Sequence, residues 1–357
     1  MGEKINKKFN ENYCINPNDE HRYVFEFCLK EQHFLHIKIK RDNEYLELAK
    51  QITGFQWFFN LFFNFLYKYH HNYEGVPANY GECIVVMDEP ATHLSVPARK
   101  EFRKFLKEYA HKNNVTLVLA THDPFLVDTD HLDEIRIVEK EEQGSAIKNG
   151  FSYDPKEYAS NNSDALYQIK RSLGVGQHVF HNPQKHRIIF VEGTTDYCYL
   201  STFKLYFNER EFKNNPIPFT FLPISGLKEE SNEMKETIQK LCELDNNPIV
   251  LIDDDRKDGS DPQKAKSERF KKANKEMPDP ITILQLSSCD NRFKQIEDCF
   301  SANDKEEYAK NKRMELVMAF KTRLLYSEKD DVVGEETKNN FLKLFEWIKE
   351  RVKQPND

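Results

Sequence analysis

The chain has 357 residues, which is enough for two domains. Hydrophobic residues make up 39% and charged residues 31%, and this balance excludes an intrinsically disordered chain. The formal net charge of −7 excludes a protein that binds nucleic acid through its overall charge, so any such contact would need a local basic patch.

The N-terminal segment, the apolar stretches and the cysteines bear on where the protein works. Residues 1–12 are polar and lack the apolar core of a signal peptide. The most apolar stretch, residues 55–69, is interrupted by polar side chains and is shorter than a membrane-spanning helix. The seven cysteines include no C-x-x-C spacing, which argues against a disulfide framework and against a structural zinc site. We therefore expect a cytoplasmic protein with reduced thiols and no membrane contact.

The first half of the chain alternates between predicted strands and helices. Short alternating runs favour a hairpin, a fully apolar run rich in β-branched residues at 83–87 indicates a buried parallel strand, and residues 115–120 indicate a second buried strand. The elements expected are a hairpin at 23–40, a helix from 43 to about 69 that Gly54 could break, strands at 83–87, 115–120 and 135–138, and a helix over 97–111. This alternation predicts a parallel sheet covered by helices.

The second half repeats this α/β alternation after a change of character. Residues 141–183 are rich in glycine and asparagine and predict a linker that holds one or two short helices. The elements expected beyond it are strands at 187–191, 218–222, 249–252 and 281–284, helices over 195–206, 229–244 and 262–275, and a charged helical tail from 304 to 352. Both halves therefore belong to the α/β class.

The first candidate site is an apolar strand that ends in two adjacent carboxylates. The run I-V-V-M-D-E-P at 84–90 puts Asp88 where it can hold Mg²⁺ through water, and Glu89 where it can polarise an attacking water. The next buried strand ends in T-H-D, and His122 there can reach a γ-phosphate. Because parallel strands present their carboxyl ends to ligands, both motifs lie at the correct edge. The alternative is an ordinary α/β sheet with charged strand ends.

The second candidate site is a set of carboxylates at two later strand ends. The run R-I-I-F-V-E-G-T-T-D ends a strand in Glu192 and places Asp196 on the first turn of the next helix. The run P-I-V-L-I-D-D-D puts Asp253 and Asp255 on one face of a strand and Asp254 on the other. These carboxylates would repel one another without a cation, and their hard oxygens suit Mg²⁺ or Mn²⁺. The alternative is a set of solvated carboxylates at loop edges.

Taken in order, these motifs resemble the OLD (overcoming lysogenization defect) family, in which an ABC-type ATPase precedes a Toprim domain. The ATPase likeness rests on G-F-Q-W-F-F at 54–59, V-M-D-E-P-A-T-H-L at 86–94 and L-A-T-H-D-P-F-L-V-D at 119–128. The Toprim likeness rests on E-G-x-x-D and D-x-D, with P-I-S-G at 223–226 between them. The resemblance implies the rear part of an ATPase domain at 1–145, a linker at 146–185, a Rossmann-like Toprim nuclease domain at 186–302 and a helical C-terminal extension at 303–357.

The resemblance implies a metal-dependent DNA endonuclease, with a role in anti-phage defence or DNA repair. Two Mg²⁺ or Mn²⁺ ions would activate the attacking water and stabilise the leaving 3′ oxygen. The implied ligands are Glu192, Asp196, Asp253, Asp255 and Glu297.

Two of the implied site residues could instead have a purely structural role or lie in solvent. Glu297, in I-E-D-C-F, could instead be an acid that stabilises a helix start. Lys321, in M-A-F-K-T-R-L-L, matches a family lysine near the scissile phosphate, but could instead be one solvated lysine among many. Residues 256–275 carry eight basic side chains, which could hold the DNA backbone or form a solvated helix face.

The sequence departs from the family at the nucleotide site. It contains no G-x-x-x-x-G-K-[ST] loop, and Ile52 stands where the family has a serine, with Thr53 as a substitute hydroxyl donor beside Gly54. We therefore expect ATP to bind only with a separate polypeptide that carries the missing Walker A loop, and a homodimer through the ATPase part. The alternative function is a truncated or split-gene subunit, inactive alone, that binds an ATPase half.

Overall fold

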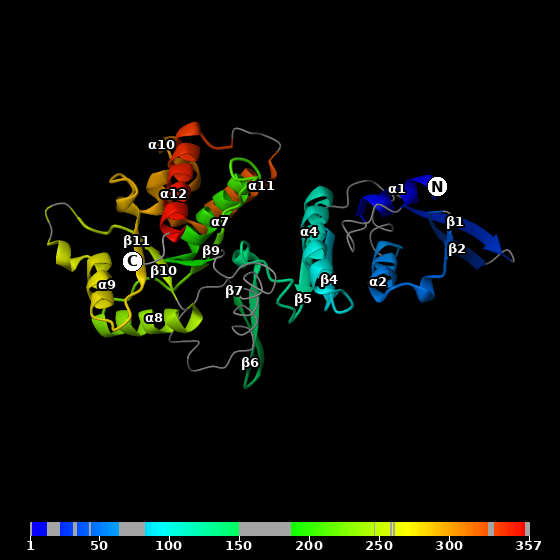
Figure 1. Ribbon diagram of the computed structural model, residues 1–357, viewed down its shortest axis with the longest axis horizontal. Helices are drawn as coiled ribbons and strands as arrows, with labels where there is room; N and C mark the ends of the chain where they lie inside the picture. The colour runs from blue at the N-terminus through cyan, green and yellow to red at the C-terminus, as the bar shows by residue number, and fades with distance from the viewer. Residues whose placement is uncertain are drawn as a thin grey trace. The chain divides into compact units, whose positions relative to one another are not determined.

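The computed structural model divides into two compact units, Met1–Leu126 and Val127–Asp357 (Figure 1). The residues that it describes are 2–12, 22–30, 34–42, 44–63, 83–149, 187–245, 247–257, 259, 261–327 and 332–353. No helix in this described part is long and apolar enough to cross a membrane.

The first unit opens with an antiparallel sheet of β1 (Tyr23–Lys30), β2 (Phe34–Arg41) and β3 (Glu44–Leu46), so the predicted hairpin is confirmed. Helices α1 (Gly2–Asn12) and α2 (Thr53–Leu61) pack on its apolar face around Phe9, whose ring meets those of Phe25 and Phe62. The helix predicted from residue 43 is wrong in its first part, because Tyr45 pairs with Lys40 across the sheet instead.

The same unit contains two parallel strands, β4 (Cys83–Asp88) and β5 (Val115–Ala120), joined by α4 (Val96–Asn113), as predicted. The prediction that both strands are buried is wrong, because their side chains alternate between half-buried and exposed. Phe102 and Leu106 of α4 pack against Leu117 and Leu119 of β5. The opposite face of the two strands leaves three apolar side chains exposed, Ile84 at 65%, Val86 at 71% and Val118 at 47%.

The second unit begins with a hairpin that the sequence did not predict. The predicted third parallel strand is wrong: β6 (Arg136–Glu141) pairs antiparallel with β7 (Gly144–Asn149). Gly144 has a φ of 143°, which only glycine adopts without strain and which allows the tight turn. The part of the predicted linker that follows Asn149 lies outside the described residues.

The segment just before this hairpin is held by the second unit. The Tyr197 hydroxyl donates a hydrogen bond to the Thr129 carbonyl oxygen at 3.0 Å and accepts one from the Leu132 amide at 2.8 Å. Lys204 forms an ion pair of 2.7 Å with Asp130. The boundary predicted at residue 145 therefore differs from the division between Leu126 and Val127, because these contacts tie the intervening residues to the second unit.

A four-stranded parallel sheet forms the centre of the second unit, in the order β11-β10-β8-β9. All four predicted strands are confirmed, as β8 (Arg187–Val191), β9 (Phe219–Pro223), β10 (Ile249–Ile252) and β11 (Thr282–Gln285). Helices α8 (Ser231–Leu244) and α9 (Lys266–Lys275) cover one face, and α7 (Thr194–Asn208) covers the other (Figure 1). The tail is helical as predicted, with α10 (Ala302–Tyr308), α11 (Met314–Tyr326) and α12 (Glu335–Lys353). It packs on α7 through the stacked rings of Phe203 and Phe341.

Candidate functional site

Four carboxylates gather at the carboxyl edge of the central sheet. Glu192 follows β8, Asp196 lies in the first turn of α7, and Asp253 follows β10, the strand next to β8. The fourth, Glu297, belongs to a short 3-10 helix, Ile296–Cys299. Glu192 Oε1 accepts a hydrogen bond of 2.9 Å from the Asp253 amide, which ties the two strand ends together. We call Glu192, Asp196, Asp253 and Glu297 the acidic cluster.

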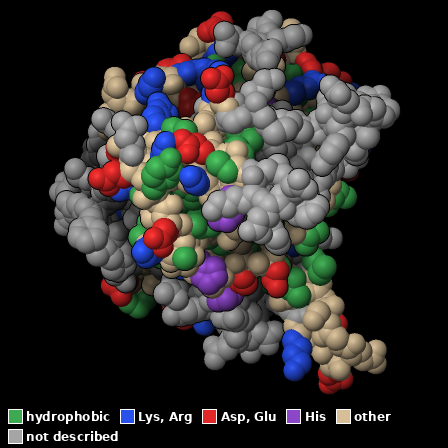
Figure 2. Space-filling view, turned by 90° about the vertical axis from the view of Figure 1, so that its right-hand side faces the viewer, with side chains coloured by type: hydrophobic (Ala, Val, Ile, Leu, Met, Phe, Trp, Pro, Cys, Tyr) green, Lys and Arg blue, Asp and Glu red, His purple; other side chains and the backbone are tan. Residues whose placement is uncertain are grey.

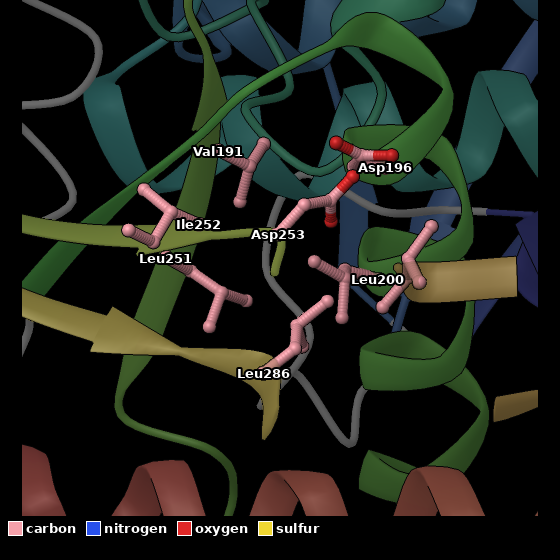
Figure 3. A pocket seen from close by; sticks show the side chains of 8 residues that line it. Val191, Asp196, Leu200, Leu251, Ile252, Asp253 and Leu286 are labelled. Carbon is pink, nitrogen blue, oxygen red and sulfur yellow. The ribbon is translucent and has the colours of Figure 1, made fainter. Parts of the chain in front are cut away.

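Apolar side chains lie beneath the acidic cluster and form what we call its apolar floor. In Figure 3 the carboxylates of Asp196 and Asp253 lie close together above Leu200, Leu251 and Leu286. Burial first, and the charge of Glu297 second, raise the pKa of Asp196 to about 7. Burial first, and the charges of Asp196 and Glu192 second, raise the pKa of Asp253 to about 9. Burial also raises the pKa of Glu192. These carboxyl groups therefore resist ionisation while no cation compensates their charge.

Several oxygens of the acidic cluster have no hydrogen-bond donor. Within the described residues, neither carboxylate oxygen of Glu297 accepts a hydrogen bond of good geometry, and neither does Asp196 Oδ1, although all three atoms are buried. Glu297 Oε2 has a long ion pair of 3.4 Å with Lys312, which leaves Glu297 Oε1 and Asp196 Oδ1 without any partner in the described part of the chain. Glu297 is only 1% exposed. Because buried polar atoms are nearly always satisfied in folded proteins, these oxygens indicate a site for a cation or another ligand.

Lys312 is the cation beside the acidic cluster, and the sequence did not single it out. Its Nζ atom lies 3.4 Å from Glu297 Oε2. Burial acts to lower the pKa of Lys312, but the charges of Glu297 and Asp196 outweigh it and raise that pKa. Asn311 and Lys312 both have positive φ, 58° and 51°, a left-handed backbone that is uncommon outside glycine. This strained turn directs Lys312 to the cluster, and asparagine's tolerance of such a turn was the available signal.

The structure does not bring Lys321 to the acidic cluster. Its Nζ atom forms hydrogen bonds of 2.6 and 2.8 Å to the two oxygens of Asp133. Both side chains are buried, at 5% and 1% exposure. A lysine held in this way is not available to a phosphate group, so Lys312 is the better candidate for that role.

The three consecutive aspartates after β10 have three different surroundings. The strand ends at Ile252, so the alternation that placed Asp253 and Asp255 on one face no longer applies. Asp253 is the one of the three that lies among the carboxylates of the acidic cluster, while the charge of Asp255 still reaches Glu192 and, after burial, helps to raise the pKa of Glu192. Asp254 pairs with Arg256, and Asp255 accepts hydrogen bonds from the amides of Lys266 and Ser267 at the start of α9.

At least four of the eight basic side chains at 256–275 form ion pairs with neighbouring carboxylates, among them Arg256 with Asp254. Arg269 pairs with Glu229 at 3.1 Å and Lys271 with Glu268 at 3.0 Å. Lys266 also pairs with Glu229. These pairs favour the interpretation of the segment as a solvated helix face. On the face of the molecule that Figure 2 shows, basic and acidic side chains are interspersed among the described residues.

In the first unit, the two predicted ATPase motifs meet. Glu89 Oε1 lies 2.6 Å from His122 Nδ1 and accepts a hydrogen bond of 3.0 Å from the His122 amide, while Oε2 accepts one from the Thr121 hydroxyl. Burial acts to raise the pKa of Glu89, but the hydrogen bonds from His122 and Thr121 outweigh it and lower the pKa. Asp88 is exposed at the end of β4, and Thr53 and Gly54 open α2.

Comparisons with known proteins add little to this geometry. No protein-family model and no curated protein matches the chain. A solved chain from a study of ATP-driven dimerization and DNA-stimulated activation of SMC ATPases is similar at 17% identity and a TM-score of 0.32, over 47% of this chain and 92% of that chain. This likeness is too weak to carry an argument, so function has to be argued from the residues themselves.

Proposed function

We propose that the second unit is a metal-dependent DNA endonuclease of the Toprim type, which hydrolyses phosphodiester bonds with Mg²⁺ or Mn²⁺. The observation that carries this proposal is the acidic cluster, with its buried oxygens that accept no hydrogen bond within the described residues. The choice of DNA as substrate rests on the resemblance of the E-G-x-x-D and D-x-D motifs to the OLD family.

The residues of the acidic cluster fit a hard divalent cation by their chemistry. All four ligands are carboxylates, which Mg²⁺ and Mn²⁺ prefer. The described residues contain no ready-made group of three or more acidic, histidine or cysteine side chains that could hold a metal ion. Cation binding therefore has to draw the carboxylates together, and it would offset both the burial and the mutual repulsion that raise the pKa of Asp196 and Asp253.

The roles of the individual side chains follow from their positions. Asp196, Asp253 and Glu297 would hold the cation, and the Asp253 amide orients Glu192 toward the same point. Once bound, the cation supplies Lewis-acid chemistry: it activates water and neutralises charge on the phosphate. Lys312 would donate to a non-bridging phosphate oxygen from the Glu297 side. The apolar floor excludes water from beneath the carboxylates.

The first unit would contribute the nucleotide-dependent part of the activity. Asp88, Glu89 and His122 would act on Mg²⁺-ATP only with a complementary Walker A loop from a separate polypeptide, and the unit would drive dimerisation. A second candidate function, a subunit that is inactive alone and binds such an ATPase half, is favoured by the exposed apolar face of Ile84, Val86 and Val118.

The variant Glu297→Gln tests the proposal, with a variant of a neighbouring residue in the same short helix as its control. We expect purified wild-type protein to nick or linearise plasmid DNA with Mg²⁺ or Mn²⁺, and Glu297→Gln to cut about 100-fold more slowly or not at all, since a ligand is lost. The control is Asp298→Asn. Asp298 caps the same helix and pairs with Lys305 at 2.6 Å, so this variant should keep cutting within about threefold despite a lost cap. Equal cutting by Glu297→Gln and wild type would sink the nuclease assignment.

Lys312→Met is expected to move two measurements in opposite directions. Cutting should fall about 10- to 100-fold, because a charge-assisted hydrogen bond to phosphate is lost. Mn²⁺ affinity should rise severalfold, because a competing positive charge beside Glu297 is removed. Lys310→Met, a change of the same kind two residues earlier, should alter neither. Unchanged cutting with Lys312→Met would remove this residue from the site.

A further inference from the structure

The structure bears on how many cations the acidic cluster can bind. The family resemblance implies two ions, and the second ion depends on Asp255. The surroundings of Asp255 and Lys312 bear directly on whether that ion has ligands.

Asp255 is committed to the start of α9. Its Oδ2 atom accepts a hydrogen bond of 2.7 Å from the Lys266 amide, and its Oδ1 atom accepts one of 3.1 Å from the Ser267 amide and another from the Ser267 hydroxyl. The first amides of a helix have no partner within the helix, and the methyl group of Ala265, which precedes α9, cannot accept a hydrogen bond from them. Asp255 therefore acts as the capping group of α9 from eleven residues upstream.

Asp254 cannot replace Asp255 as a ligand. Both of its carboxylate oxygens receive hydrogen bonds from the Arg256 guanidinium, at 2.7 and 2.5 Å, and its amide donates to the Lys294 carbonyl oxygen. This fixes Asp254 on the side of the loop that bears Lys294, so only Asp253 of the three aspartates is left to the acidic cluster.

The other flank of the acidic cluster already holds a positive charge. Lys312 lies 3.4 Å from Glu297 and stabilises the ionised forms of Asp196, Asp253 and Glu192. One divalent cation together with Lys312 supplies three positive charges against the four carboxylates of the cluster. A second divalent cation on this flank would be repelled by Lys312.

We propose that the acidic cluster binds a single divalent cation, with Lys312 in place of the second, and that Asp255 is a structural cap and not a metal ligand. This inference rests on the proposed function, since it concerns the same site. It departs from the two-ion arrangement that the sequence resemblance implies.

The test is the number of Mn²⁺ ions that the full chain binds without DNA, by titration calorimetry and by electron paramagnetic resonance of free Mn²⁺. Asp196→Asn is expected to lose one bound ion. Asp255→Asn is expected to lose none, because Asp255 is not a ligand, and the one amide oxygen of asparagine can still accept the hydrogen bonds from Ser267 at the start of α9. Asp255→Ala should bind the same number of ions but melt at a lower temperature, since the cap is gone.

The outcomes separate this inference from the proposed function. Two ions lost in Asp196→Asn, or one lost in Asp255→Asn, would overturn the single-cation site and leave the nuclease assignment standing. Mn²⁺ binding that is absent, or unchanged by Asp196→Asn, would remove the metal site itself, and both proposals would fall together.

Discussion

Lys321→Met is expected to destabilise the second unit by about 3–5 kcal/mol, the cost of leaving one partner of a buried ion pair alone. The lysine is the ion-pair partner of Asp133 in an environment where the two side chains are 5% and 1% exposed. The measurement is urea unfolding followed by the fluorescence of Trp347 in α12. The chain has two tryptophans, so a Trp57→Phe background makes Trp347 the sole reporter.

The double variant Lys321→Met with Asp133→Leu is the matched control. It removes both charges, and well-packed apolar replacements of buried ion pairs are commonly tolerated, so we expect most of the lost stability to return. The double variant should also cut DNA at close to the wild-type rate if Lys321 is structural. A folded but inactive double variant would restore Lys321 to the phosphate site, and a single variant as stable as wild type would contradict the buried pair.

The sequence was most informative where an apolar run is bounded by polar residues, because such a run has few other solutions. The strands at 115–120 and 249–252 were both predicted to the residue, although only the second is buried throughout and the first alternates between half-buried and exposed side chains. The strand at 135–138 also exists, as part of β6, but it belongs to a hairpin. Local pattern cannot tell which sheet a strand joins, because that choice depends on contacts such as those of Tyr197 with Thr129 and Leu132.

In the acidic cluster, too, some positions could be predicted from local sequence and others depend on distant contacts. Glu192 and Asp253 could be predicted because they follow adjacent parallel strands, and Asp196 because it lies in the first turn of the helix after β8, so the fold brings all three to one edge. The separation of Asp255 from Asp253 could not be predicted, because it depends on where β10 ends and on a hydrogen bond to the Lys266 amide, eleven residues later, at the start of α9. The sequence also could not show that Lys312, and not Lys321, lies beside the cluster. That difference depends on the pairing of Lys321 with Asp133, 188 residues away in sequence.

Metal-free protein is expected to lose stability as the pH rises from about 5 to about 9, and Mg²⁺ or Mn²⁺ should restore it. In the folded state the pKa of Asp196 is raised to about 7 and that of Asp253 to about 9, against 3.8 for an unperturbed aspartate. Between these values the unfolded chain releases protons that the folded chain retains, so unfolding becomes more favourable as the pH rises. The contribution is fully present below about pH 4 and is lost by about pH 9. Melting temperatures in EDTA should fall across this range, by roughly 2–4 °C for each kcal/mol of stability lost in a unit of this size.

Asp253→Asn isolates this effect from other titrating groups. Asparagine mimics the protonated acid, so this variant should be more stable than wild type at pH 9 in EDTA and should gain little from Mg²⁺. Asp290→Asn is the control of opposite sign. The hydrogen bond from Arg292 lowers the pKa of Asp290, so its ionised form stabilises the fold and its loss should lower the melting temperature at the same pH. If Asp253→Asn is instead less stable than wild type at pH 9 without metal, the carboxylates are not under the mutual repulsion that a cation would relieve.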